Sequence, residues 1–232
     1  NKINQLEELS YIIAHNLRGP AGNIRMITEA LLDKIRNSTR ESDNVLADSL
    51  THEQGLTFIE ESSDALMSSL STLMQITEIK LNQDIPYNDC DVAAAIADIA
   101  AQLQSVIYDK QARLVLNLEI PHISYPKPYL ENVLYNLVSN ALKYSRPGIV
   151  PEIVITTRMQ DGRAQIIVKD NGLGIDMDRY GSRVFQLNQV FHSGFDSKGV
   201  GLYITRTQVE SLGGSIEVKS AVGEGSEFIV TL

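Results

Sequence analysis

Two long runs of apolar residues at helical spacing constrain this chain most strongly. Within residues 3–35 and again within residues 52–82, apolar side chains recur at steps of three, four or seven. Thr51 and Gln54 form a capping box ahead of the second run. We therefore expect a helical hairpin with a polar connection at residues 37–50. The apolar positions are Leu6, Leu9, Ile13, Leu17, Ile24, Ile27, Leu31 and Ile35, then Leu56, Ile59, Leu66, Leu70, Leu73, Ile76 and Leu81.

A hairpin of two helices buries little apolar surface by itself. Pairing with a second copy would cover both apolar stripes and give a four-helix bundle by symmetry. The sequence therefore predicts that residues 1–85 form a dimerisation domain.

The pattern changes after residues 82–89, which are polar and contain Pro86. Helices are expected from Asp91 to about Tyr108, at 129–145 and at 200–212, and strands at 113–118, 152–159, 163–169, 215–219 and 226–232. Neighbouring strands joined by tight links such as 160–162 indicate an antiparallel or mixed sheet with helices on one face. The second domain, residues 89–232, is thus expected to be an α/β sandwich.

The charge of the chain limits its partners. With 20 basic and 29 acidic residues, the net charge of −9 disfavours a surface for nucleic acid, so phosphate binding must be local. The single Cys90 fits a reducing compartment, and no apolar run approaches the roughly 20 residues that span a bilayer. We expect a cytoplasmic fragment of a longer protein, because Asn1 lies within the helical pattern and an upstream region is missing.

Four polar segments could carry chemistry. His15 lies in the first helical run, and a neutral imidazole can accept a phosphoryl group. Residues 136–144 place amides and a lysine on one helix face. Residues 170–174 form a D-x-G-x-G turn after a strand. Residues 198–202 put glycines at a helix start, where backbone amides can bind phosphate. Each segment alone is a weak signal of function. A segment like the first often contains a packed histidine, one like the second is often a solvated helix face, and one like the third is often an ordinary turn.

Together and in this order, the segments resemble the catalytic core of the sensor histidine kinases of two-component signalling. That core is a phosphoacceptor hairpin followed by a Bergerat-type ATP-binding domain. His15 to Pro20 is similar to the H box, Asn136 to Tyr144 to the N box, and Asp170 to Gly174 and Gly199 to Leu202 to two glycine boxes. Residues 222–226 are similar to the final glycine box, and Phe185 and Phe191 to the aromatic box.

The resemblance implies ATP-dependent autophosphorylation of a histidine and transfer to the receiver domain of a response regulator. It implies ATP and Mg²⁺ as cofactors, with Asn140 as the metal ligand, Asp170 reading the adenine amino group and Lys198 near the γ-phosphate. Gly172 and Gly174 would let base and ribose lie close. The H box residues implied in catalysis are His15, Asn16 and Arg18, and the nucleotide-binding residues are Asn136, Asn140, Lys143, Tyr144, Asp170, Gly172, Gly174, Lys198, Gly199, Gly201, Leu202 and Ser226.

Three positions depart from the family pattern. Asn16 stands where an acid is frequent, which predicts orientation of the imidazole without base catalysis. Gly19 stands where a threonine or asparagine is common, which predicts weak phosphatase activity. His192 follows Phe191 where an arginine is often found, so an arginine contribution is not expected here.

Two other functions stay open from the sequence. A Bergerat-fold ATPase or serine-directed kinase would share the second-domain motifs but would not need His15. A phosphotransfer or dimerisation scaffold with a decayed nucleotide site is disfavoured because Asn140, Asp170 and the glycine pairs are intact.

Overall fold

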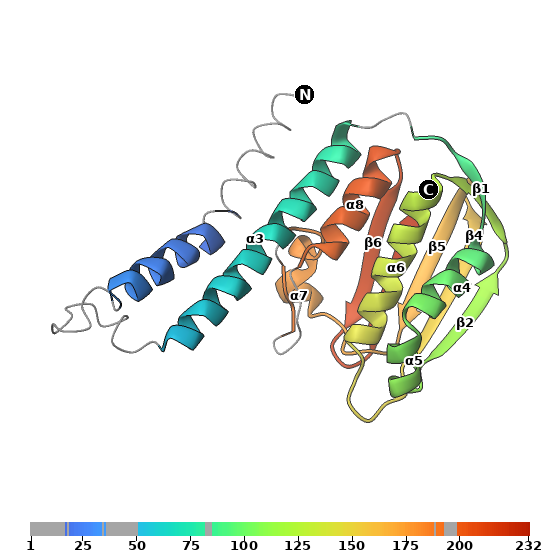
Figure 1. The fold of residues 1–232 in the computed structure, drawn as a ribbon. Helices are drawn as coiled ribbons and strands as arrows, with labels where there is room; N and C mark the ends of the chain where they lie inside the picture. The colour runs from blue at the N-terminus through green and yellow to red at the C-terminus, as the bar shows by residue number, and fades with distance from the viewer. Residues whose placement is uncertain are drawn as a thin grey trace. The chain divides into compact units, whose positions relative to one another are not determined.

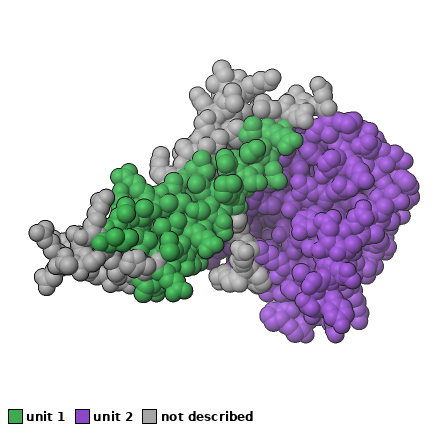
Figure 2. Space-filling view, viewed as in Figure 1, with its two compact units in different colours: residues 1–78 green, residues 79–232 purple. Residues whose placement is uncertain are grey.

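The fold is given by a computed structural model that describes residues 17, 19–33, 35, 51–81, 85–187, 189–192 and 199–232. His15, Asn16, Arg18 and Lys198, named above as site residues, lie outside these residues. The chain divides into two compact units, residues 1–78 and 79–232 (Figure 2).

The first unit is helical. Residues 17, 19–33 and 35 are helical, and the long helix α3 (His52–Leu81) follows (Figure 1). The predicted capping box is confirmed: the Gln54 amide donates to Thr51 Oγ1 at 3.1 Å, and the Thr51 amide donates to Gln54 Oε1 at 2.9 Å. A Cβ atom at Gly55 would lie 2.7 Å from Leu31 Cδ2, so the two helical segments touch at this point.

The second unit is an α/β domain whose helices lie on one face of its large sheet (Figure 1). Its elements are β1 (Asn88–Asp91), α4 (Val92–Gln102), α5 (Gln104–Lys110), β2 (Arg113–Leu118), β3 (His122–Tyr125), α6 (Lys127–Lys143), β4 (Glu152–Gln160), β5 (Arg163–Asp170), α7 (Met177–Tyr180), a 3₁₀ turn at Gly181–Arg183, α8 (Gly201–Ser211), β6 (Ser215–Ala221) and β7 (Gly225–Thr231).

The large sheet is mixed, as predicted. Its strand order is β2-β4-β5-β7-β6, with β2 and β4 parallel and the other neighbours antiparallel. The β4–β5 hairpin turns at Asp161 and Gly162, whose φ angles of 52° and 77° match the right-handed twist of the strands. Contacts of α4 with β2, α6 with β5 and α8 with β6 place the core between helices and sheet.

Two features differ from the expectations. A small antiparallel sheet of β1 and β3 pairs residues 88–91 with 122–125. The sequence analysis placed a polar linker at 82–89 and predicted no strand in either segment. Four residues with one buried side chain, Cys90, are too short to show a period. The helix predicted from Asp91 to Tyr108 is divided at Leu103 into α4 and α5. Ile96, Ile99 and Leu103 keep helical spacing across the break, so periodicity could not reveal it.

None of the helices among the residues that the structure describes is long and apolar enough to cross a membrane.

Candidate nucleotide site

Helix α6 separates its polar residues from the core, as its sequence predicted. Its buried side chains are Tyr129, Leu130, Val133, Leu134, Leu137, Val138, Ala141 and Leu142. Asn136, Asn140 and Lys143 are half-buried on the other side. Asn136 Nδ2 donates to Thr205 Oγ1 of α8 at 3.3 Å and to Asn132 Oδ1 at 3.0 Å. Asn136 therefore connects α6 to α8.

Asp170 ends β5 and is held by two backbone amides. Its Oδ1 accepts hydrogen bonds from Gly172 N at 2.8 Å and from Ser226 N at 3.2 Å. Burial raises the pKa of the Asp170 carboxyl above its ordinary value, against the opposing effect of these two amides and of Arg146. Both of these bonds use Oδ1, and neither uses Oδ2.

The glycines of the 170–174 turn pack against backbone. A Cβ atom at Gly172 would lie 2.6 Å from the carbonyl oxygen of Tyr144, and one at Gly174 would overlap the carbonyl oxygen of Ala221. Gly174 also has a φ of +68°, which L side chains rarely adopt. These two glycines let the turn close onto the end of α6 and the end of β6.

The start of α8 faces the same region. Gly201 and Leu202 open the helix, so their amides have no acceptor within it, and Val200 at the N-cap forms no side-chain cap. A Cβ atom at Gly201 would lie 3.3 Å from Asn136 Oδ1, which shows how closely this end approaches α6. Such a helix end can bind the oxygens of a phosphate.

Two adjoining pockets join these parts. The larger has a volume of about 290 Å³ and the smaller about 40 Å³, and they share Asn140, Tyr144, Phe191 and Leu202. The larger is also lined by Lys143, Val184, Gln189, Gly199, Val200 and Gly201. The smaller is also lined by Ala141, Asp170, Gly174, Ile175, His192, Ser226 and Phe228. One pocket thus holds the buried carboxyl group, and the other holds the lysine and the helix start.

The structure brings together most of the residues that the sequence proposed for the nucleotide. Asn140, Lys143, Tyr144, Asp170, Gly174, Gly199, Gly201, Leu202 and Ser226 line the two pockets. Asn136 and Gly172 do not line them but pack against residues that do.

Several residues that line the pockets, and one that holds the turn beside them, were not singled out from the sequence. Val184, Ile175 and Phe228 look like core residues in a sequence, because nothing marks an apolar side chain that borders a pocket. His192 was noted only as a departure from the family, and its ring lies 5.3 Å from that of Tyr144. Arg146 follows the N box by two residues, and its charge was an available signal.

Comparisons with known proteins agree with this geometry. Residues 127–232 match the family described as histidine kinase-, DNA gyrase B- and HSP90-like ATPases. The chain is 27% identical over 229 residues to the sensor protein SrrB of Staphylococcus aureus. The aligned region covers 95% of this chain and 36% of that protein. The chain therefore spans about a third of the length of the curated relatives that it matches.

Solved structures share the fold. The Acinetobacter baumannii histidine kinase AdeS matches with a TM-score of 0.62 and 21% identity, over 94% of this chain and 96% of that one. Histidine kinase ThkA, solved in complex with the response regulator protein TrrA, matches with a TM-score of 0.65 and 18% identity, over 100% of this chain and 62% of that one. Full-length ShkA, solved with AMPPNP, matches with a TM-score of 0.62 and 22% identity, over 97% of this chain and 45% of that one.

These findings support the resemblance that the motifs predicted. A helical region followed by a mixed α/β ATPase domain is the architecture of the histidine kinase cores, and the sequence similarity to a sensor kinase covers nearly the whole chain. The chain is therefore similar in sequence to a sensor protein and in fold to histidine kinases, and its residues 127–232 match the ATPase family.

Proposed function

We propose that this chain phosphorylates its own His15 with the γ-phosphate of ATP and passes the phosphoryl group to an aspartate of a response-regulator receiver domain. The observation that carries the proposal is the pair of adjoining pockets, which joins Asp170 to Asn140, Lys143 and the start of α8 within the part of the chain that matches the ATPase family. The ShkA and ThkA structures, solved with AMPPNP and with a response regulator, favour the same ligand class and partner class.

Different pocket residues bind the base and the phosphates of the nucleotide. Asp170 Oδ2 accepts a hydrogen bond from the adenine amino group, since Oδ1 is already engaged by two amides. The amides of Gly201 and Leu202 and the ammonium group of Lys143 meet the phosphates, because these groups line the larger pocket. The backbone amide of Ser226 holds the Asp170 carboxylate in place by a hydrogen bond to Oδ1.

Asn140 is the proposed magnesium ligand. It lines both pockets, and an amide oxygen is a hard ligand of the type that Mg²⁺ takes. Among the described residues, no group of three or more histidine, cysteine or acidic side chains could hold a metal. The ion would neutralise charge on the phosphates.

His15 is the proposed nucleophile. A lone pair on its Nε2 forms the new bond to the γ-phosphorus while the bond to the bridging oxygen breaks and ADP leaves. Asn16 can orient the imidazole through a hydrogen bond but cannot take its proton, so we expect a slow kinase. Gly19 has no side chain that could position a water, so we expect weak phosphatase activity.

Dimerisation through residues 1–85 is part of the proposal, with residues 89–232 as the catalytic domain. Among the side chains of α3 that the structure describes, five large apolar ones are exposed in the single chain, namely Leu56, Phe58, Met67, Leu70 and Met74. Spacings of eleven, three and four residues put Leu56, Met67, Leu70 and Met74 on one face of the helix, and Phe58 lies off that face. A second copy would cover this face in a four-helix bundle inside the cytoplasm.

One experiment separates the proposed kinase from its alternatives. The chain is incubated with Mg²⁺ and ATP labelled at the γ-phosphate, with His15→Ala as the test variant and the exposed His122→Ala as the matched control. Acid-labile protein label that is lost only in His15→Ala supports the kinase. Release of phosphate without label would indicate an ATPase, acid-stable label a serine-directed kinase, and no nucleotide binding a scaffold.

A further inference from the structure

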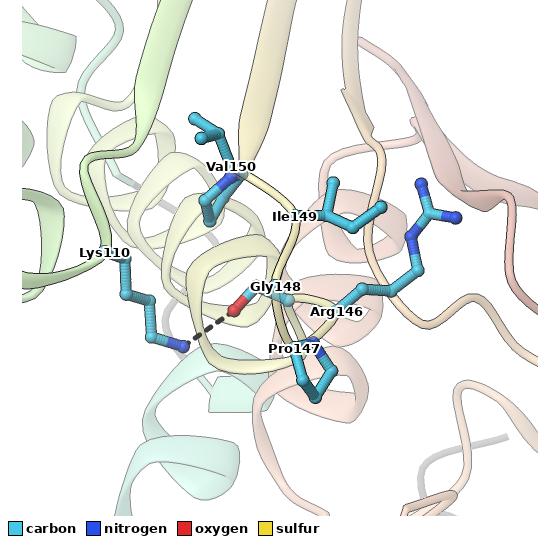
Figure 3. A pocket seen from close by; sticks show the side chains of 8 residues that line it. Lys110, Arg146, Pro147, Gly148, Ile149 and Val150 are labelled. Atoms are coloured by element: carbon cyan, nitrogen blue, oxygen red, sulfur yellow. Dashed lines mark hydrogen bonds between the residues drawn. The ribbon is translucent and has the colours of Figure 1, made fainter.

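Two cationic side chains, Lys110 and Arg146, anchor the start of the loop that follows α6, residues 145–151. Lys110 of α5 donates to the carbonyl oxygen of Leu142 at 2.7 Å and to Ser145 Oγ at 2.8 Å. Arg146 points from the other side of the loop, away from Lys110 (Figure 3). A pocket of about 470 Å³, lined by Lys110 and residues 145–151, lies along the loop.

Arg146 reaches two turns that are distant in sequence. Its Nε donates to the carbonyl oxygen of Asn171 at 2.8 Å, and its Nη1 donates to the carbonyl oxygen of Gly223. Asn171 belongs to the 170–174 turn, and Gly223 belongs to the turn between β6 and β7. One guanidinium group therefore joins the 170–174 turn, whose Gly172 amide binds Asp170, to the turn that precedes β7, whose Ser226 amide binds the same carboxylate.

These bonds close a ring around the turn. The Gly223 amide donates to the carbonyl oxygen of Leu173 at 2.7 Å, and the Leu173 amide donates to the carbonyl oxygen of Tyr144 at 2.8 Å. Tyr144 is two residues before Arg146, so the chain itself completes the circuit. A ring of this kind restrains all three segments together, since none can shift without breaking a bond of another.

The side chain of Asn171 anchors the same turn to the loop. Its Nδ2 donates to the carbonyl oxygen of Val150 at 3.0 Å, and its Oδ1 accepts from the amide of Glu152 at 3.0 Å. The neighbouring Asp170 and Gly172 are thereby tied to residues 146–152, away from the pocket in which the nucleotide is proposed to bind.

We propose that Arg146 is a positioning residue for base recognition, which holds the 170–174 and 222–226 turns so that the Asp170 carboxylate faces the base. The inference rests on the proposed ATP site. Arg146 does not line either pocket of that site, so it acts through the turns and not on the nucleotide. Its planar group presents two separate nitrogen atoms, Nε and Nη1, to the two carbonyl oxygens, whereas a lysine in its place would have to reach both from one nitrogen atom.

The test compares two nucleotides that differ in one donor. The dissociation constants of Mg·ATP and of the Mg²⁺ complex of purine riboside triphosphate, which lacks the 6-amino group, are measured by calorimetry on the full chain. In Arg146→Ala the constant for ATP should rise about tenfold and that for the analogue less than about threefold, because only ATP uses the bond to Asp170. Both nucleotides carry the same charge, so the loss of a positive charge cancels in the comparison.

Two further variants keep the test decisive. Arg146→Lys should give an intermediate ratio of the two constants, and it serves if the alanine variant does not fold. Arg163→Ala is the matched control, because Arg163 also donates to a loop carbonyl oxygen, that of Gly213, but outside this network. An equal rise for both nucleotides, or no rise, would overturn the inference. If the unmodified chain binds neither nucleotide, the proposed function itself fails.

Discussion

The amide of Ser226 donates a hydrogen bond to Asp170 Oδ1 at 3.2 Å, although the two residues are 56 positions apart. The bond joins the first residue of the 170–174 turn to the start of β7. Because the Gly172 amide binds the same oxygen at 2.8 Å, two backbone amides fix the position of the carboxylate, and Asp170 lines the smaller pocket.

Asp170→Asn should abolish most ATP binding without unfolding the domain. The amide oxygen can keep both backbone bonds, but an NH₂ group then replaces Oδ2 and meets the adenine amino group, donor against donor. We expect the dissociation constant for ATP to rise roughly 10- to 100-fold. Calorimetric titration measures it, and unchanged affinity would show that Asp170 does not read the base.

The affinity for ATP should depend on pH through the protonation of Asp170. Burial raises the pKa of Asp170, and the ionised carboxylate is the form that accepts from the amino group, so affinity falls as pH falls through this raised pKa. The loss therefore begins at a higher pH than for an aspartate at its ordinary 3.8. Affinity is measured against pH for the native chain and for Asp170→Asn, and parallel profiles would contradict the prediction.

The same group should affect folding stability with the opposite sign. Because its folded-state pKa is raised, the protonated form of Asp170 is favoured in the folded protein. Its stabilising contribution is present below the unfolded-state pKa and is lost as pH rises through the folded-state pKa. At neutral pH, Asp170→Asn should therefore leave the free energy of unfolding unchanged or raise it, as denaturant titration would show.

Gly174→Ala should destabilise the second unit. The new methyl group would overlap the carbonyl oxygen of Ala221 at a backbone φ of +68°. We expect a loss of about 2–4 kcal/mol in the free energy of unfolding. Gly148→Ala is the control, since its φ of +75° is similar but nothing lies within 4 Å of its added Cβ atom. Equal losses in both variants would mean that backbone strain alone is responsible.

Lys143→Ala should weaken ATP binding through the phosphates. Lys143 lines the larger pocket, whereas the exposed Lys219 pairs with Glu227 at 3.9 Å on β6 and β7 and lines neither pocket. Loss of a charge-assisted bond predicts a roughly 10- to 100-fold weaker dissociation constant for Lys143→Ala. Lys219→Ala should change it little, because exposed ion pairs contribute little. Equal effects at both lysines would place the phosphates elsewhere.

Much of the fold was readable from local patterns. Thr51 and Gln54 indicate the start of α3. Asp91 caps α4 by accepting a hydrogen bond from the Ala94 amide at 3.0 Å, and Asp161 and Gly162 form the turn of the β4–β5 hairpin. Such signals lie within a few neighbouring residues, where the chemistry of a cap or turn is complete. The β1–β3 sheet could not be read in this way, because its partners are more than thirty residues apart and each strand is short.

The residues that could bind a nucleotide are recognisable from spacing alone, because an amide face on α6, a D-x-G-x-G turn and a glycine-rich helix start are each local patterns. The contacts that these residues make are visible only in the folded domain. It turned Asn136 toward Thr205 of α8, placed Asn140 in both pockets, and joined Arg146 to the carbonyl oxygens of Asn171 and Gly223. The hydrogen-bond partners of a side chain depend on which turns the folded sheet brings together, and the spacing of residues in the sequence does not show which turns will meet.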